Sequence, residues 1–216
     1  MRRPILLLPL VLSGLIPFGV TPLASQELGG FFSFGSSDQV ELPSPSGFGA
    51  FAQWEFPGPW LVRLSLHRVG QDTRKEGIVC RNYSARIDCH PEMTDTSVTM
   101  GGLRGAFMKA FDLGGRVRIG GGIGASFNQI HAEATGEEGD RADLLAPNTG
   151  QVGFLALLTA AIAPVPGIPV RIKGTVTSHW VNFRSCSSNE PPEYAPFCGS
   201  NTFKDVELGL SYTFPR

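Results

Sequence analysis

The sequence predicts an all-β protein, an eight-stranded antiparallel up-and-down transmembrane β-barrel. Three observations predict it. Residues 203–214 alternate strictly between apolar and polar side chains, no segment beyond the first 25 residues is apolar enough for a transmembrane helix, and long and short connections alternate along the chain. The alternation has the two-residue period of a strand with one apolar face. About twelve residues tilted by about 45° cross the roughly 30 Å hydrocarbon core of a bilayer.

The first residues predict export. Two arginines at positions 2 and 3 precede an apolar run at residues 5–20, and a cleavage site follows near Ser25. This order of a basic segment, an apolar segment and small residues is typical of a secretory signal peptide. We therefore expect a signal peptide in residues 1–25 and one barrel domain in residues 26–216.

The composition agrees with a barrel and excludes other classes of protein. The 18 Lys and Arg residues balance 19 Asp and Glu, so no excess of positive charge favours nucleic acid as a partner. The 27 glycines and 15 phenylalanines are typical of strands and tight turns. Because a chain without a transmembrane helix can satisfy its backbone groups in lipid only as a closed barrel, any membrane-spanning structure has to be one.

Eight strands are expected from the alternating segments and the turn residues between them. They cover residues 29–35, 47–56, 60–69, 96–111, 116–130, 150–163, 168–183 and 203–214.

The connections between these strands fall into two kinds. Short turns rich in Pro and Gly occupy residues 57–59, 112–115 and 164–167, and long polar loops occupy residues 36–46, 70–95, 131–149 and 184–201. Successive connections of an up-and-down barrel lie at opposite ends, so all long loops share one end and both termini share the other. Short periplasmic turns and long external loops are typical of bacterial outer-membrane barrels, which predicts an outer-membrane location with periplasmic termini.

The bulky side chains are expected to face lipid. An eight-stranded barrel has room inside only for closely packed side chains, so the aromatic residues would overfill it. Several of them lie near strand ends, where interfacial girdles form, and we assign five as membrane-interface anchors: Trp54, Trp60, Trp180, Tyr212 and Phe214. The alternative, a soluble secreted barrel with the two faces exchanged, has the same period but needs these aromatics inside.

The opposite face carries charges that we assign to the barrel interior: Glu55, Arg63, Arg104, Arg116, Arg118, Arg171, Lys173, Asp205 and Glu207. An arginine facing lipid at mid-bilayer costs roughly 2–4 kcal/mol, which is why this face is placed inward. Two interpretations stay open. The charges pair and close the lumen, or they line a narrow pore for small solutes.

In pattern, the chain resembles the small eight-stranded outer-membrane proteins related in fold to the OmpA transmembrane domain, OmpX and OmpW. The resemblance covers nearly all of residues 26–216 and rests on no short motif. Such families often finish on a terminal aromatic residue, whereas here Pro215 and Arg216 follow Phe214. The resemblance implies contact with outer-membrane lipids and lipopolysaccharide, and insertion by the barrel-assembly machinery.

Four cysteines in an exported protein favour disulfides. Cys80 and Cys89 fall in one predicted external loop, and Cys186 and Cys198 in another, so local pairing within each loop is expected. No Cys-x-x-Cys spacing supports a structural zinc site instead. The bridges would stiffen the loops and carry no chemistry.

No catalytic site, metal site or cofactor is expected. Lipid A deacylases with this fold present a His-x-Ser motif, but His179 is followed by Trp180 and Val181. Ser65 and His67 share the inward face without an identifiable acidic partner, so they are interpreted as lining. Acidic residues in the loop at 131–149 could recruit divalent cations that bridge lipopolysaccharide, and the long loops could bind an external ligand.

The sequence therefore predicts an outer-membrane barrel with a structural or surface-interaction role. A narrow solute pore is the second hypothesis, and a lipid-modifying enzyme embedded in the barrel is the third.

Overall fold

The computed structural model describes residues 25–37, 45–83, 86–135, 141–182 and 200–214. Within them lie eight strands: β1 (Ser25–Ser37), β2 (Ser46–Glu55), β3 (Trp60–Tyr83), β4 (Arg86–Leu113), β5 (Val117–Thr135), β6 (Arg141–Ile162), β7 (Val170–Asn182) and β8 (Ser200–Phe214). The predicted signal peptide lies almost wholly outside the described residues, because residues 1–24 do.

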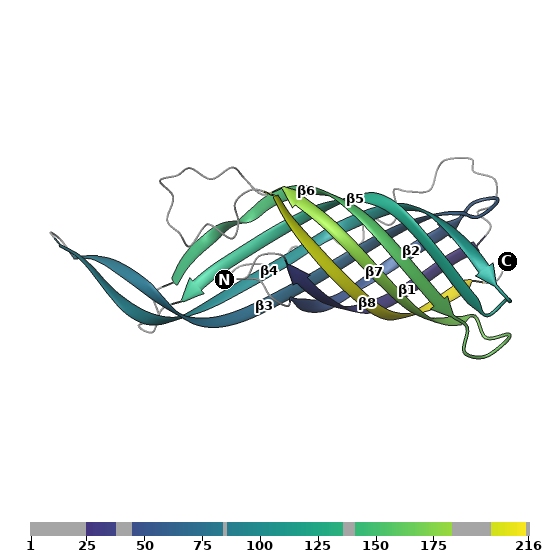
Figure 1. Ribbon diagram of the computed structural model, residues 1–216, viewed down its shortest axis with the longest axis horizontal. Coiled ribbons are helices and arrows are strands. Elements are labelled where there is room, and N and C mark those ends of the chain that lie inside the picture. The colour runs from purple at the N-terminus through teal and green to yellow at the C-terminus, as the bar shows by residue number, and fades with distance from the viewer. Residues whose placement is uncertain (1–24, 38–44, 84–85, 136–140, 183–199, 215–216) are drawn as a thin grey trace, which may run out of the picture.

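The strands form one closed barrel in which each strand pairs antiparallel with the next. Pairing of β1 with β8, from Gln26 opposite Phe214 to Ser37 opposite Phe203, closes the ring (Figure 1). The predicted fold class is confirmed. No helix in the described part of the chain is long and apolar enough to cross a membrane.

Short connections lie at the three predicted turns, although the one between β6 and β7 spans residues 163–169 and is longer than predicted. Gly58, Gly114, Gly115 and Gly167 have φ angles of 89°, 64°, 77° and 83°. These values lie in the left-handed region, which glycine enters without the steric cost that a Cβ imposes. The three turns and the ends of β1 and β8 at Ser25 and Phe214 lie at one end of the barrel, here called the turn end. The opposite end is the loop end.

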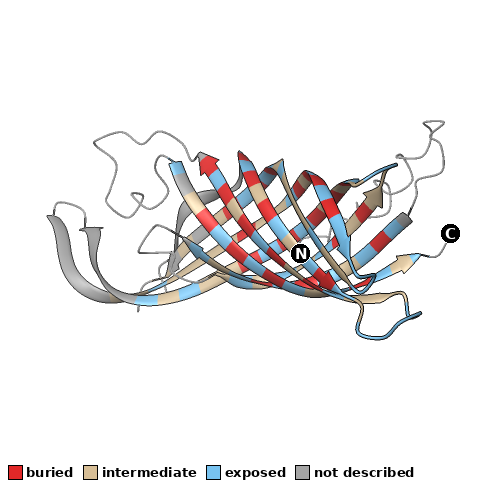
Figure 2. Ribbon diagram, turned by 45° about the vertical axis from the view of Figure 1, so that its right-hand side comes forward, coloured by how far each residue is buried: buried red, intermediate tan, exposed pale blue. Residues whose placement is uncertain are grey.

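Burial alternates along the strands of the barrel (Figure 2). The exposed positions carry mostly apolar side chains, and several charged side chains of the barrel strands are buried. Large apolar residues are exposed around the whole ring, among them Ile123, Phe154 and Leu158 at 73%, 72% and 69%. Charged residues such as Arg63, Arg104 and Lys173 are at most 5% exposed. This arrangement is the inverse of a water-soluble barrel and suits a protein that has lipid on its outside.

The predicted loop at residues 70–95 is wrong, because this segment continues strands β3 and β4. Pairing of β2 with β3 ends at Ser46 opposite Gly70, whereas β3 and β4 remain paired as far as Tyr83 opposite Arg86. The result is a two-stranded extension, the β3–β4 ribbon (residues 74–95), which projects beyond the barrel (Figure 1). A ribbon that has lipid on neither face does not need an apolar face. Its sequence therefore lacks the apolar–polar alternation of the other strands.

The predicted loop at residues 131–149 is also too long. β5 continues to Thr135 and β6 begins at Arg141, and their pairing shifts register between Ile130 and Glu133. β1 likewise exceeds its predicted bounds, since it begins at Ser25 and ends at Ser37. The loop predicted at residues 184–201 lies mostly outside the described residues.

Candidate functional site

The barrel interior is the candidate site, because it gathers nearly all buried polar side chains of the described residues. The first group lies in the middle of the lumen. Arg63 on β3 donates from Nη2 to Glu207 Oε2 at 2.7 Å and from Nη1 to Thr175 Oγ1 at 2.9 Å. Arg104 on β4 contacts the other Glu207 oxygen at 3.1 Å and Asp205 Oδ2 at 2.5 Å. Two arginines from β3 and β4 thus balance two carboxylates from β8.

A second group lies nearer the turn end. Lys173 Nζ is 2.9 Å from Glu27 Oε1 and donates to Gln53 Oε1 at 3.0 Å. Gln53 Nε2 donates to Glu27 Oε2 at 3.0 Å, and Ser211 donates to the same carboxylate. The Phe51 ring connects the two groups, since its centroid is 4.5 Å from Lys173 Nζ and 4.4 Å from Arg63 Cζ. Such cation–π contacts compensate partly for lost hydration.

Glycines on the inner face make room for the buried aromatic rings. A Cβ on Gly49 would lie 2.3 Å from the Phe31 ring, and one on Gly29 would lie 2.6 Å from the Phe51 ring. Real Cβ atoms do not come so close to another atom. Two phenylalanines therefore pack inside a narrow barrel because their neighbours have no side chain.

At the turn end the interior finishes with a smaller, partly exposed group. Arg118 on β5 pairs with Glu55 on β2 and lies 3.8 Å from Asp112. The Arg118 and Glu55 side chains are 14% and 21% exposed, so water reaches this group. It is more exposed than the two charged groups above it, whose side chains are at most 5% exposed.

Toward the loop end, Ser126, Asn128 and His179 form a neutral polar cluster. Ser126 Oγ bonds His179 Nε2, and Asn128 Nδ2 donates to Ser126 Oγ at 3.0 Å. This differs from a catalytic triad, because no described carboxylate or amide contacts His179 Nδ1. The three side chains are 4%, 0% and 0% exposed, so a lipid substrate outside the barrel cannot reach them.

An apolar ring lies between this cluster and the loop end. Five buried residues from β3, β4, β5, β7 and β8 pack together there, none more than 6% exposed: Val69, Met100, Ile130, Val181 and Phe203. Nothing in the sequence marks this ring, since other inward positions, such as Leu155 and Leu157, are apolar as well. Only the register of five strands brings them to one level.

A small internal cavity lies among the charged side chains in the middle of the barrel. A cavity of about 10 Å³ lies between the arginine groups and Leu155 and Leu157. That volume holds about one water molecule. In the described part of the chain, no three His, Cys, Asp or Glu side chains gather as a metal site requires.

Seven of the nine charges assigned to the interior form these groups: Glu55, Arg63, Arg104, Arg118, Lys173, Asp205 and Glu207. Arg171 is half-buried at the turn end of β7. Arg116 does not belong to the interior, because it is exposed in the turn between β4 and β5. The strand predicted at residues 116–130 begins one residue later, at Val117, which places Arg116 outside the alternation.

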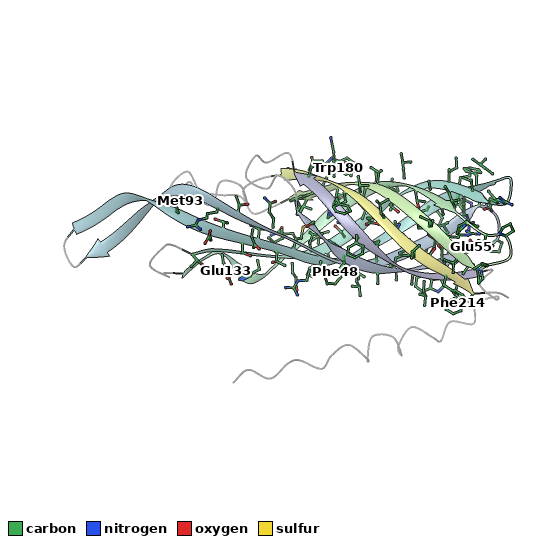
Figure 3. The ribbon with its side chains drawn as sticks, turned by 90° about the horizontal axis from the view of Figure 1, so that it is seen from below. Phe48, Glu55, Met93, Glu133, Trp180 and Phe214 are labelled. Atoms are coloured by element: carbon green, nitrogen blue, oxygen red, sulfur yellow. The ribbon has the colours of Figure 1, made fainter. Side chains whose placement is uncertain are left out.

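The five aromatic residues assigned to the interfaces lie at the two ends of the lipid-facing surface. Trp60, Tyr212 and Phe214 are 42–43% exposed near the turn end, and Trp180 is 44% exposed near the loop end. Figure 3 shows Trp180 and Phe214 at opposite ends of the barrel. Trp54 is half-buried near the turn end.

Of the cysteines, Cys80 and Cys89 occupy directly opposite positions in the β3–β4 ribbon. Cys186 and Cys198 lie outside the described residues. Opposite residues in an antiparallel pair have Cα atoms about 4.5–5.5 Å apart, which is within the range that a disulfide spans. The backbone therefore permits the predicted Cys80–Cys89 bridge.

Sequence reasoning missed Glu27 and Gln53. Glu27 precedes the strand predicted at residues 29–35, but it is 3% exposed and accepts three side-chain contacts. Its inward position follows from the alternation once β1 begins at Ser25. The sequence does contain a signal for this orientation, because Glu27 is two residues before Gly29 and therefore on the same face of the strand.

Comparison by sequence finds no match: no protein-family model and no curated protein matches the chain. Comparison by structure finds several. A major outer membrane protein from Thermus thermophilus aligns with a TM-score of 0.58 at 16% identity, over 88% of this chain and 99% of that one. Ail, the attachment invasion locus protein of Yersinia pestis, solved with the heparin analogue sucrose octasulfate, aligns with a TM-score of 0.53 at 12% identity, over 88% and 98%.

The Neisserial surface protein A aligns with a TM-score of 0.50 at 13% identity, over 88% of this chain and 97% of that one. Together with the closed ring, the apolar outer face and the paired charges inside, these likenesses define the class. The chain has the fold of the small bacterial outer-membrane β-barrels.

Proposed function

We propose that this protein is an integral outer-membrane barrel that conducts no solute and acts structurally or through its external surface. Two layers of side chains inside the barrel support the proposal. Paired charges occupy its middle, and the apolar ring of Val69, Met100, Ile130, Val181 and Phe203 packs together nearer the loop end. Ions cross a constriction only if water does, and a narrow apolar constriction excludes water. A solute pore, the second hypothesis, would need a path past both layers.

Single-channel recording of refolded protein in planar bilayers tests the closed lumen. The wild-type barrel should give no resolved conductance steps. Glu207→Gln should lower stability without creating conductance, because the apolar ring is untouched. Regular steps in the wild type, altered in size by Glu207→Gln, would instead support a narrow pore.

The β3–β4 ribbon is the part best placed for surface interaction. It extends past the ends of both neighbouring strands, so no described strand lies beside its two outer edges between residues 74 and 94 (Figure 1). Its four basic and four acidic residues balance, which leaves the charge of a partner undefined. We propose that the ribbon lies outside the cell and both termini in the periplasm.

Epitope insertion tests this orientation. A tag placed after Tyr83, at the tip of the ribbon, should be labelled by antibody on intact cells. The same tag placed after Gly58, in a short turn, should be labelled only after the outer membrane is permeabilised. The reverse pattern would refute the proposed orientation.

At the loop end, lipopolysaccharide is the proposed lipid partner. Arg68 and Lys204 are exposed on the outward face near that end, close to the level of Trp180. Cations at the level of Trp180 are well placed to attract the phosphate groups of lipopolysaccharide. Insertion by the barrel-assembly machinery is proposed from the fold, with Tyr212 and Phe214 as the aromatic end of the last strand.

We propose no enzymatic role. The third hypothesis, a lipid-modifying enzyme, is disfavoured by the complete burial of His179 and Asn128 and by the lack of a described partner for His179 Nδ1. Assays of purified barrel with phospholipid and lipid A should release no fatty acid above the level of a Ser126→Ala variant. Release that depends on Ser126 would establish catalysis.

A further inference from the structure

Lys109 is a cation on the lipid-facing surface at the turn end. It lies four residues before the end of β4 at Leu113, in the outward phase shared by Phe107 and Phe111, and its side chain is exposed. Four residues of a tilted strand correspond to about 9 Å along the membrane normal. Lys109 therefore lies within the interfacial zone, among the aromatic residues of the turn end.

Aromatic rings hold the ammonium group in place. Lys109 Nζ is 5.5 Å from the centroid of the Trp60 ring and 5.2 Å from that of Phe111. Trp60 in turn stacks on Phe107 with the ring centroids 4.9 Å apart and an interplanar angle of 16°. The cation is thus fixed between two rings instead of extending freely toward water.

No described carboxylate forms an ion pair with Lys109. The nearest acid along β4, Asp112, belongs to the inward phase and lies 3.8 Å from Arg118. An unpaired cation facing lipid needs a counter-charge, and at this depth phosphate groups supply it. If the turn end is periplasmic, as proposed above, these phosphates belong to glycerophospholipids and not to lipopolysaccharide.

We propose that Lys109, held between Trp60 and Phe111, binds the phosphate of an anionic glycerophospholipid in the leaflet at the turn end. The ammonium group contacts the phosphate, and the rings lie at the level of the glycerol backbone. The site rests on the transmembrane fold and on the proposed orientation, and it is independent of whether the lumen conducts.

Fluorescence quenching of Trp60 tests the site. With Trp54→Phe and Trp180→Phe, Trp60 is the only tryptophan, and the protein is refolded in phosphatidylcholine vesicles that contain brominated phosphatidylglycerol or brominated phosphatidylcholine. The relative affinity for phosphatidylglycerol should be about three- to fivefold above that for phosphatidylcholine. Lys109→Met should abolish this preference, and Lys109→Arg should retain it.

A matched control measures quenching at the loop end of the barrel, with Trp180 as the only tryptophan. Lys109→Met should leave the ratio of Trp180 quenching by the two brominated lipids unchanged, whereas Lys204→Met should alter that ratio. An unchanged preference at Trp60 in Lys109→Met would overturn the proposal. So would displacement of brominated phosphatidylglycerol by lipid A at lower concentration than by unlabelled phosphatidylglycerol, because the ligand would then be lipid A.

A second measurement covers the case in which the tryptophan replacements prevent refolding. Spin-labelled phosphatidylglycerol and phosphatidylcholine report the motionally restricted lipid around the otherwise native chain. Lys109→Met should lower the motionally restricted fraction of phosphatidylglycerol and leave that of phosphatidylcholine unchanged. Equal fractions before and after the substitution would refute the site, whatever single-channel recording shows.

Discussion

At the scale of single residues, the interior shows how an eight-stranded barrel accommodates charge. Glu207 gives one oxygen to Arg63 and the other to Arg104, at 2.7 Å and 3.1 Å. Removing one partner of a buried ion pair strongly destabilises the folded protein, because neither water nor another group replaces the lost contact. Glu207 is therefore the residue on which both arginines depend.

Glu207→Gln should lower the free energy of unfolding by about 3–5 kcal/mol, since it leaves two buried guanidinium groups with one remaining carboxylate. Denaturant titration of barrels refolded in vesicles measures this. Asp95→Asn is the matched control, because Asp95 pairs with Arg74 at 3.6 Å with both side chains more than 60% exposed. Exposed pairs contribute about 0–1 kcal/mol, so a similar loss in both variants would contradict the role of Glu207.

At the scale of elements, β4 and β5 approach each other closely through glycine. A Cβ on Gly124 would lie 2.0 Å from the carbonyl oxygen of Gly105, whereas one on Gly174 would come no nearer than 3.8 Å to any atom. Backbone cannot move aside as a flexible side chain does. The close approach of these two strands therefore depends on the absence of a side chain at position 124.

Gly124→Ala should destabilise the barrel by about 1–3 kcal/mol, the usual cost of overpacking. Gly174→Ala should have an effect within about 0.5 kcal/mol, because its methyl group would face outward in ordinary contact with Leu208. Unfolding titrations of the two variants measure the difference. Equal stability of both variants would show that β4 can shift to make room.

The β3–β4 ribbon is the element that most needs a covalent constraint. A two-stranded ribbon alone is marginally stable in water, and Cys80 lies directly opposite Cys89. Oxidised protein should contain a Cys80–Cys89 disulfide, detected by mass spectrometry of non-reduced peptides. Cys80→Ser with Cys89→Ser should speed proteolysis of the ribbon and leave unfolding of the barrel unchanged. Peptides linking Cys80 to Cys186 or Cys198 would contradict the local pairing.

At the scale of the whole molecule, depth in the membrane should decide the cost of a new charge. Ile123 is 73% exposed, six residues after β5 begins at Val117, and Val165 is 47% exposed in the turn between β6 and β7. Ile123→Arg should destabilise the folded barrel by about 2–4 kcal/mol in vesicles, and Val165→Arg by less than about 1 kcal/mol. Refolding equilibria in the same lipid measure both. Equal costs would mean that no bilayer surrounds β5.

Most of the fold could be predicted because lipid imposes one simple rule on every spanning strand. Phe154 and Leu158 face lipid, whereas Leu155 and Leu157, at odd separations from them, face inward. The ribbon and the ends of β5 and β6 escaped prediction because water surrounds them on both faces, so no alternation records them. Arg116 was misplaced for a related reason. It lies one residue before β5 begins, where the alternation between the two faces no longer applies.

The sequence by itself determined which side chains face lipid, because a two-residue period assigns every position of a strand to one of two faces. It also indicated where the short turns lie, because Gly enters the left-handed region without steric cost and Pro fixes φ. Only the tertiary structure decided which charges meet, how far β3 and β4 extend, and that five apolar residues form one ring. Those features depend on the register between strands and on ring closure, which bring together residues that are far apart in the chain.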